Sequence, residues 1–332
     1  MSHQRTRLPF WRRWPDRKVE PILAAVASLT LLLIIGMVGF VFAKAWPSFA
    51  ANGLSWFGSG GNIDKELAAI FNSPANPKDY VYTVHMWPLI WGTALTTAGA
   101  LFFGFFLAMF GAIFMVEFAP AWLVRILDPV VKLLAAVPSV IYGLIGVLLL
   151  VPFVGQSLIT AEQKESVQYV VQLNGSSILV AIVVLTIMVT PIMLALNVDA
   201  FRAVPGNWKE GAASLGVNRW RVMVTIVVRA ARPAILAAAV LATARALGEA
   251  IMLSMVTGSV GFAPNPLDGL VFLYEPTRPL AATIVDNREG LSVVPFGQTL
   301  YAIAAVLLIS AALLSLASWA IKQPMKKYGI TA

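Results

Sequence analysis

The stretch Phe201-Arg-Ala-Val-Pro-Gly-Asn-Trp-Lys-Glu-Gly-Ala-Ala-Ser-Leu-Gly216 stands between two long apolar runs, and it organises the rest of the chain. The second run contains Arg245-Ala-Leu-Gly-Glu249, which sets two opposite charges among apolar residues. A basic segment between two membrane-length runs indicates a loop at a membrane surface. The charged pair indicates a polar site within the bilayer.

The composition is that of a membrane protein. The 332 residues are 59% hydrophobic and 12% charged, whereas a soluble domain carries about a quarter charged residues. The chain has no cysteine and two histidines, His3 and His85, which excludes disulfides and thiol catalysis and argues against a metal site. The net charge of +8 comes from basic residues beside apolar runs, so we expect lipid contact and no nucleic-acid partner.

Six segments are long and apolar enough to cross a bilayer, which takes roughly 20 residues at 1.5 Å each. They cover residues 22–45, 87–116, 127–152, 177–200, 233–257 and 296–321. The first is too long for the apolar core of a signal peptide, so we expect it to be retained. The sequence therefore predicts an all-α integral membrane protein with six transmembrane helices.

This layout divides the chain into four parts. Residues 1–21 form a basic tail, and residues 22–86 form the first transmembrane helix and an outer loop. Residues 87–321 form a core of five transmembrane helices that includes the loop 202–232, and residues 322–332 form a second tail.

Lysine and arginine residues gather on one side of the predicted membrane. Seventeen lie in the two tails, the connection 117–132 and the loop 201–232, whereas six lie in the opposite loops. The positive-inside rule places both termini and the 201–232 loop in the cytoplasm. The outer segments 46–86, 153–176 and 259–295 are either a landing surface for an outside partner or solvated loops, and the sequence leaves both readings open.

The cytoplasmic loop carries a series of helix start and stop signals. We expect Asn207, with Glu210 three residues later, to cap a short helix that ends at Leu215. Gly216 then suits a left-handed end. Asn218 is expected to cap a second helix over about 219–231, and Pro233 fits the first turn of the fifth span.

The same loop offers a surface for another protein. Ala212, Ala213 and Ser214 allow close approach, and Trp208 and Trp220 are aromatic anchors of the kind found at interfaces. The alternative is that the loop is a linker that happens to be helical.

The spacing from Glu210 to Gly216 and from Gly216 to Ile226 resembles the "EAA" loop of ABC importer permeases. Two departures are visible, since Gly211 stands at the first alanine and Val228-Arg229 replaces Leu-Pro. The resemblance implies that a separate ATPase dimer binds the loop 202–232. The positions that it assigns to coupling are Glu210, Gly211, Ala212, Ala213 and Gly216.

Arg245 lies about 18 Å along the fifth span from Pro233, near the middle of a hydrocarbon layer roughly 30 Å thick. Glu249 is four residues later, so we expect both on one helix face, toward an interior cavity. A guanidinium there can hold a tetrahedral oxyanion by forked hydrogen bonds. Glu249 would neutralise Arg245 when the cavity is empty. The alternative is a structural ion pair that fixes helix packing.

Several segments resemble the permeases of phosphate importers, and more closely the C-type than the A-type of the two Pst permeases. They are Arg245-Ala-Leu-Gly-Glu249, Met255-Val-Thr-Gly258, Val137-Pro-Ser-Val-Ile-Tyr-Gly143 and Leu185-Thr-Ile-Met-Val-Thr-Pro191. The resemblance implies a type I ABC importer permease that pairs with an A-type permease. It also implies an extracytoplasmic phosphate-binding protein at the outer loops, and phosphate passage by Arg245 and Glu249. Ala250 replaces the usual threonine of the family.

Further candidates for the substrate path surround two prolines. Pro138 and Pro191 fall inside predicted spans, where proline kinks a helix. The hydroxyls of Ser139, Tyr142 and Thr190 are near these kinks and could donate to phosphate. Packing between helices is an equally good interpretation of each. The small residues of the second span suit close helix contact: Thr93, Thr96, Thr97, Gly99 and Gly104.

The chain has no Gly-x-x-x-x-Gly-Lys-Ser/Thr phosphate loop, so we expect no ATP hydrolysis and no cofactor here, with ATP and Mg²⁺ on the partner ATPase. We predict a permease subunit that imports phosphate across a bacterial cytoplasmic membrane. Sulfate, molybdate or phosphonate remain alternative substrates. A self-sufficient secondary transporter is the alternative class, which inverted repeats would favour.

Overall fold

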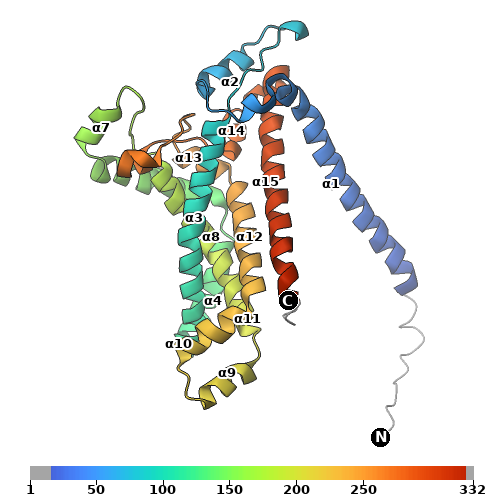
Figure 1. Ribbon diagram of the computed structural model, residues 1–332, viewed down its shortest axis with the longest axis vertical. Helices are drawn as coiled ribbons and strands as arrows, with labels where there is room; N and C mark the ends of the chain where they lie inside the picture. Colours follow the sequence, from blue (N-terminus) through green and yellow to red (C-terminus); the bar gives the residue numbers. More distant parts are fainter. Residues whose placement is uncertain (1–15, 327–332) are drawn as a thin grey trace.

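The computed structural model describes residues 16–326, and these form an elongated helical bundle (Figure 1). The basic residues of segment 1–15 and the tail 327–332, which the topology argument uses, lie outside the described residues. Within them, helix α1 begins at Asp16 and helix α15 continues to Lys326, so helix extends into both predicted tails.

Five helices of the described part are long and apolar enough to cross a membrane. Four are α1 (Asp16–Asn52), α3 (Trp87–Ile113), α8 (Ile178–Arg202) and α15 (Val294–Lys326). The other, Ser139–Leu158, joins α5 (Ser139–Ile145), the π-helical turn η5 (Gly146–Leu150), α6 (Val151–Phe153) and the π-helical turn η6 (Val154–Leu158). Another π-helical turn, η4 (Phe114–Phe118), extends α3.

The prediction for the third span was wrong in its boundaries. The segment 127–152 covers the end of α4 (Ala121–Ala135), a break at 136–138, and then α5, η5 and the first residues of α6. Pro138 is the residue that caps the start of α5, at φ −57° and ψ 136°, so it does not kink a continuous helix. Proline lacks an N–H and disfavours helical geometry in the residue before it, which explains why the helix restarts here. Pro191 does lie inside α8, and that helix continues through it.

The fifth span is also interrupted. Segment 233–257 is realised as α12 (Arg232–Leu247) and α13 (Ile251–Val256), with a break at residues 248–250. The preceding helical segment, Arg219–Ala230, meets α12 at an angle of 72°. It consists of α10 (Arg219–Val222), the π-helical turn η7 (Met223–Val227) and α11 (Val228–Ala230). By length and composition, this segment taken together with α12 is the sixth candidate crossing.

Small residues of α3 allow α8 to pack closely against it, as predicted for the second span. A Cβ on Gly99 would lie 2.6 Å from Ile182, and one on Gly111 would lie 2.8 Å from Leu194. Glycine at these points brings the two backbones together, which is how helices gain van der Waals contact in lipid. The α3–α8 pair is thus the centre of the bundle, and α12 packs on it.

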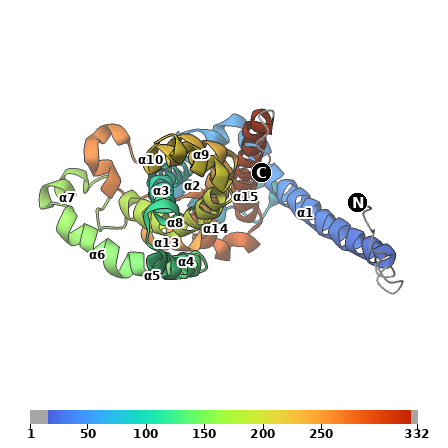
Figure 2. The same ribbon diagram turned by 90° about the horizontal axis from the view of Figure 1, so that it is seen from below.

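Helix α1 projects away from the other helices (Figure 2). Residues 21–37 are exposed all round, whereas the later part of the helix contacts α15, where the Phe40 and Tyr301 rings are 5.7 Å apart. The exposed part is apolar on every face, which is typical of a helix surrounded by lipid or by another membrane subunit.

The two ends of the bundle carry different structures (Figure 1). The outer segments fold into short helices: η2 (Gly53–Phe57), α2 (Ile63–Phe71), η3 (Pro77–Asp79), α7 (Ala161–Val167), η8 (Pro266–Tyr274), α14 (Leu280–Asp286) and η9 (Arg288–Ser292). Trp56, Ile63 and Phe296 belong to one buried cluster that fixes α2 to α15. The opposite end carries α9 (Gly206–Ser214) and α10.

Candidate functional site

The candidate path residues Arg245 and Glu249 lie at the break between α12 and α13. Arg245 is in the last turn of α12 and is exposed, whereas Glu249 follows the end of that helix and is 9% exposed. They do not form an ion pair within 4.0 Å, so the predicted neutralising pair on one helix face was wrong. The four-residue spacing gives a shared face only in a continuous helix, and the helix ends at Leu247.

Glu249 has a different partner. Its Oε1 accepts a hydrogen bond from the backbone N–H of Met252 at 3.2 Å. The first N–H groups of a helix have no intrahelical acceptor, so this carboxylate satisfies one of them at the start of α13.

Helix α5 brings Tyr142 to the same region. A Cβ on Gly143 would lie 3.1 Å from Met252 Cα, so α5 and α13 pack almost backbone to backbone. Tyr142 precedes Gly143 in α5 and is buried beside this contact. Its hydroxyl donates to the carbonyl of Leu134 at 2.9 Å, which ties α5 to α4 across the break at Pro138. The structure therefore brings Tyr142, Arg245 and Glu249 into one region.

The other two candidate donors are placed differently. Thr190 is half-buried, and its hydroxyl donates to the carbonyl of Thr186 at 2.7 Å. A Cβ on Gly104 would lie 3.4 Å from Thr190 Oγ1, so Thr190 faces α3. Ser139 is half-buried in the first turn of α5. The contacts of Thr190 favour a packing role.

The loop at the opposite end forms an exposed helix and turn. Helix α9 begins at Gly206 after Pro205, two residues earlier than expected, so Asn207 and Glu210 do not form the predicted capping box. Glu210, Gly211 and Ala213 are exposed, and Ala212 is half-buried.

Gly216 ends α9 in the left-handed conformation that the sequence predicts, at φ +76°. The N–H of Gly216 donates to the carbonyl of Ala213, and the N–H of Val217 donates to that of Ala212. These two bonds form a Schellman motif, which glycine makes without steric cost. Asn218 caps the next helix, as predicted, by accepting from the N–H of Arg221 at 2.8 Å. The turn therefore holds α9 in a fixed orientation.

One side of the loop is buried against the bundle, and the other side is exposed. Met223 and Val227 are buried against Phe201 of α8. Leu215, by contrast, is 83% exposed at the tip, and Trp208 and Trp220 are about half exposed. Sequence reasoning found the two tryptophans but missed Leu215, although its place just before Gly216 marks it as a tip residue.

An ion-pair network connects this loop to α4. Asp128 accepts from Lys132 at 2.7 Å and from Arg202, in the last turn of α8, at 3.1 Å. The hydrogen bond from Lys132, and then that from Arg202, hold the pKa of Asp128 below its usual value. Arg202 lies four residues before α9, so the network ties α4 to the base of the loop.

These features define a class of protein: a multi-span helical subunit with a charged break in one membrane helix and an exposed helix on one face. Residues 100–322 match the family described as "Binding-protein-dependent transport system inner membrane component", and the chain belongs to that family. Its members are membrane components of ABC importers, which work with an ATPase and an extracytoplasmic binding protein.

Curated relatives align over most of the chain. The "Probable ABC transporter permease protein YqgH" of Bacillus subtilis is 31% identical over 258 residues, which cover 77% of this chain and 76% of the relative. "Phosphate transport system permease protein PstC" of Haemophilus influenzae is 30% identical over 327 residues, which cover 92% and 94%. "Phosphate transport system permease protein PstC 1" of Mycobacterium bovis is 31% identical over 276 residues, which cover 80% and 79%.

Solved structures confirm the fold. The MetNI methionine ABC transporter in an inward-facing conformation matches with a TM-score of 0.52 at 17% identity, covering 74% of this chain and 98% of that chain. A bacterial alginate ABC transporter, in complex with an alginate pentasaccharide-bound periplasmic protein, matches with a TM-score of 0.54 at 16% identity, covering 95% and 99%. The predicted architecture of a type I ABC importer permease is therefore confirmed.

Proposed function

We propose that this chain is the permease subunit of an ATP-driven importer of inorganic phosphate. Its relatives in Haemophilus influenzae and Mycobacterium bovis carry the name of phosphate transport permeases. The observation that carries the proposal is Arg245, an exposed guanidinium at the end of an intramembrane helix.

An arginine at this depth is costly against lipid, so it must face a polar cavity. Because Arg245 is exposed on the single chain, the cavity is completed by a second subunit, which we take to be a homologous A-type permease. Arg245 binds the anion there through forked hydrogen bonds, and Tyr142 of α5, which packs against α13, is a second candidate contact. Thr190 is a weaker candidate because its hydroxyl donates to the backbone of its own helix, and Ser139 stays a candidate in the first turn of α5.

The exposed loop gives the ATPase its binding surface. Helix α9, with Glu210, Gly211, Ala212 and Ala213, docks on a dimeric ATPase that holds ATP and Mg²⁺, and Gly216 fixes its angle. This arrangement requires α9 and both termini in the cytoplasm, and the outer helices on the side of the phosphate-binding protein.

Orientation is tested by cysteine labelling, for which the chain is well suited because it has no cysteine of its own. With the importer in intact cells, a cysteine at Ser73 should react with an impermeant maleimide, and one at Asn207 should react only after the membrane is opened. The reverse pattern would reject this orientation.

Substrate and site are tested in liposomes that contain the assembled importer, with phosphate and sulfate supplied in parallel. Phosphate uptake should exceed sulfate uptake, and Arg245→Ala should abolish it while the subunits still assemble. Preferential sulfate uptake would change the substrate. Normal phosphate uptake by Arg245→Ala would remove Arg245 from the path.

A further inference from the structure

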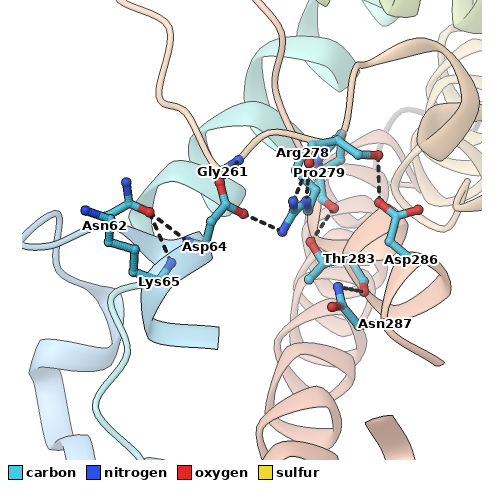
Figure 3. A network of polar contacts seen from close by, with 10 residues as sticks. Asn62, Asp64, Lys65, Gly261, Arg278, Pro279, Thr283, Asp286 and Asn287 are labelled. Atoms are coloured by element: carbon cyan, nitrogen blue, oxygen red, sulfur yellow. Dashed lines mark hydrogen bonds and ion pairs between the residues drawn. The ribbon is translucent and has the colours of Figure 1, made fainter. Parts of the chain in front are cut away.

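The outer face carries a network of polar contacts centred on Arg278 (Figure 3). Its guanidinium pairs with Asp64 of α2 at 2.8 Å, and its Nε donates to the carbonyl of Ser259 at 2.8 Å. The Ser259 hydroxyl donates to Asp286 of α14 at 2.7 Å, and the other oxygen of Asp64 accepts from the N–H of Gly261 at 3.0 Å. The network therefore joins α2, the segment 259–261 and α14, and within it Arg278, whose side chain is 14% exposed, contacts Asp64 and Ser259.

Ser259 has an unfavourable backbone conformation. Its φ is +51°, the only positive φ at a residue other than glycine within 16–326. Left-handed geometry is sterically unfavourable for a residue that carries a Cβ. The contacts to Arg278 and Asp286 hold Ser259 in place, and such held strain is typical of switch segments.

The strained residue is connected to the candidate path by a short piece of chain. Ser259 follows α13 by only three residues, and α13 begins at the break where Glu249 caps it. The Ser259 hydroxyl also lies 3.2 Å from the carbonyl of Ser254 in α13. Movement of Ser259 would therefore act directly on α13.

The network is accessible from outside. Asp64, Arg278 and Asp286 line an open cavity of about 390 Å³ on the outer face, together with residues of α2 and η9. A protein that binds this face can reach the ion pair without any rearrangement of the bundle.

We infer that Arg278 is a positioning residue: together with Asp64, Ser259 and Asp286 it forms a latch that holds the segment after α13 until the binding protein docks. Docking displaces the Asp64–Arg278 contact, Ser259 leaves its left-handed conformation, and α13 shifts at the break beside Arg245. The inference rests on the proposed function only in its need for a binding protein and an ATPase, and it does not depend on the substrate.

The test measures ATP hydrolysis by the complete importer in nanodiscs, with and without its binding protein. Arg278→Gln should raise the basal rate about fivefold and reduce the stimulation by the binding protein by a similar factor, a modest coupling between sites. Ser259→Ala, which keeps the strain and loses the bond to Asp286, should act in the same direction. Arg288→Gln is the matched control, because Arg288 is an exposed arginine on η9 whose contact is a 3.4 Å bond to the carbonyl of Val285.

The partners are tested by a double-mutant cycle. Asp64→Asn should raise basal hydrolysis, and adding Arg278→Gln should raise it little further, because both changes release one contact. Unchanged basal and stimulated rates in assembled Arg278→Gln would overturn the latch. So would a parallel fall of both rates in Arg278→Gln and Ser259→Ala, since a purely structural role predicts that result. An unmodified importer that responds to its binding protein but takes up no phosphate would refute the substrate assignment and leave this test valid.

Discussion

The carboxylate of Glu249 is bonded to the backbone N–H of Met252, and it makes no ion pair with Arg245. This contact changes what each charged residue of the fifth span is expected to do. Glu249 bonds to the start of α13, whereas Arg245 is exposed and makes no ion pair with it.

The effect of replacing Glu249 on stability should therefore depend on whether the new side chain can still accept a hydrogen bond. Glu249→Ala removes the acceptor and should cost about 1 kcal/mol, the usual effect of losing a helix cap. Glu249→Gln keeps an acceptor oxygen and should cost less. Thermal unfolding of the purified protein in detergent measures the difference, and equal losses for the two variants would contradict this role.

Arg245 and Glu249 should behave as independent sites in stability measurements. Because they are unpaired, the effects of Arg245→Ala and Glu249→Gln on unfolding free energy should add to within about 0.5 kcal/mol. Tyr142→Phe is the control, because it removes a hydrogen bond to the carbonyl of Leu134 and alters neither charged residue. A coupling energy above about 1 kcal/mol would restore the ion-pair interpretation.

The turn after α9 should tolerate only residues that adopt positive φ. Gly216→Val places a β-branched side chain at φ +76°, so it should strain the turn and weaken ATPase binding. Gly216→Asn is the control, since asparagine adopts positive φ at a lower cost than a β-branched residue. The measurement is the amount of ATPase that co-purifies with each variant. Full ATPase recovery with Gly216→Val would indicate that the loop is only a linker.

Gly92 should be intolerant of any side chain. A Cβ there would lie 2.3 Å from Thr277 Oγ1, where the outer segment crosses α3, so Gly92→Ala should cost about 1–3 kcal/mol of stability. The second change Thr277→Ala removes the clashing atom and should recover part of that loss. Thermal unfolding of the single and double variants tests this, and an additive loss would show that the clash is not the cause.

Glu275 should make the outer segment sensitive to pH. Its side chain is 4% exposed and Oε2 has no hydrogen-bond partner, so burial, and then the Asp268 charge, raise the pKa of Glu275 above 4.5. The folded state therefore holds the proton more tightly than the unfolded state. This contribution to stability is complete below pH 4.5 and is lost as the pH rises through the raised pKa.

Glu275→Gln keeps the shape and removes the charge. The variant should unfold at a higher temperature than the unmodified protein at pH 8 and at a similar temperature at pH 4. Asp268→Asn should shift the unmodified profile in the same direction but less, because its charge is the smaller cause. Parallel profiles for Glu275→Gln and the unmodified protein between pH 4 and pH 8 would contradict the assignment.

The sequence by itself determined the features that depend on near neighbours. Hydropathy over about 20 residues located the apolar runs, because the cost of burying polar groups in lipid is summed along each run. The left-handed end at Gly216 and the cap at Asn218 were also predictable, since their bonds join residues a few positions apart. The excess of lysine and arginine in the loops on one side predicts an orientation in the membrane, which cysteine labelling tests.

Only the tertiary structure decided how those elements are interrupted and joined. The break at residues 248–250, which no proline marks, accompanies the close packing of α13 on α5, where a Cβ on Gly143 would lie 3.1 Å from Met252 Cα. The Asp64–Arg278 contact joins residues from opposite ends of the chain. No local pattern specifies such a pair, because it forms only after α2 and α14 have been brought to the same end of the bundle by the burial of their apolar faces.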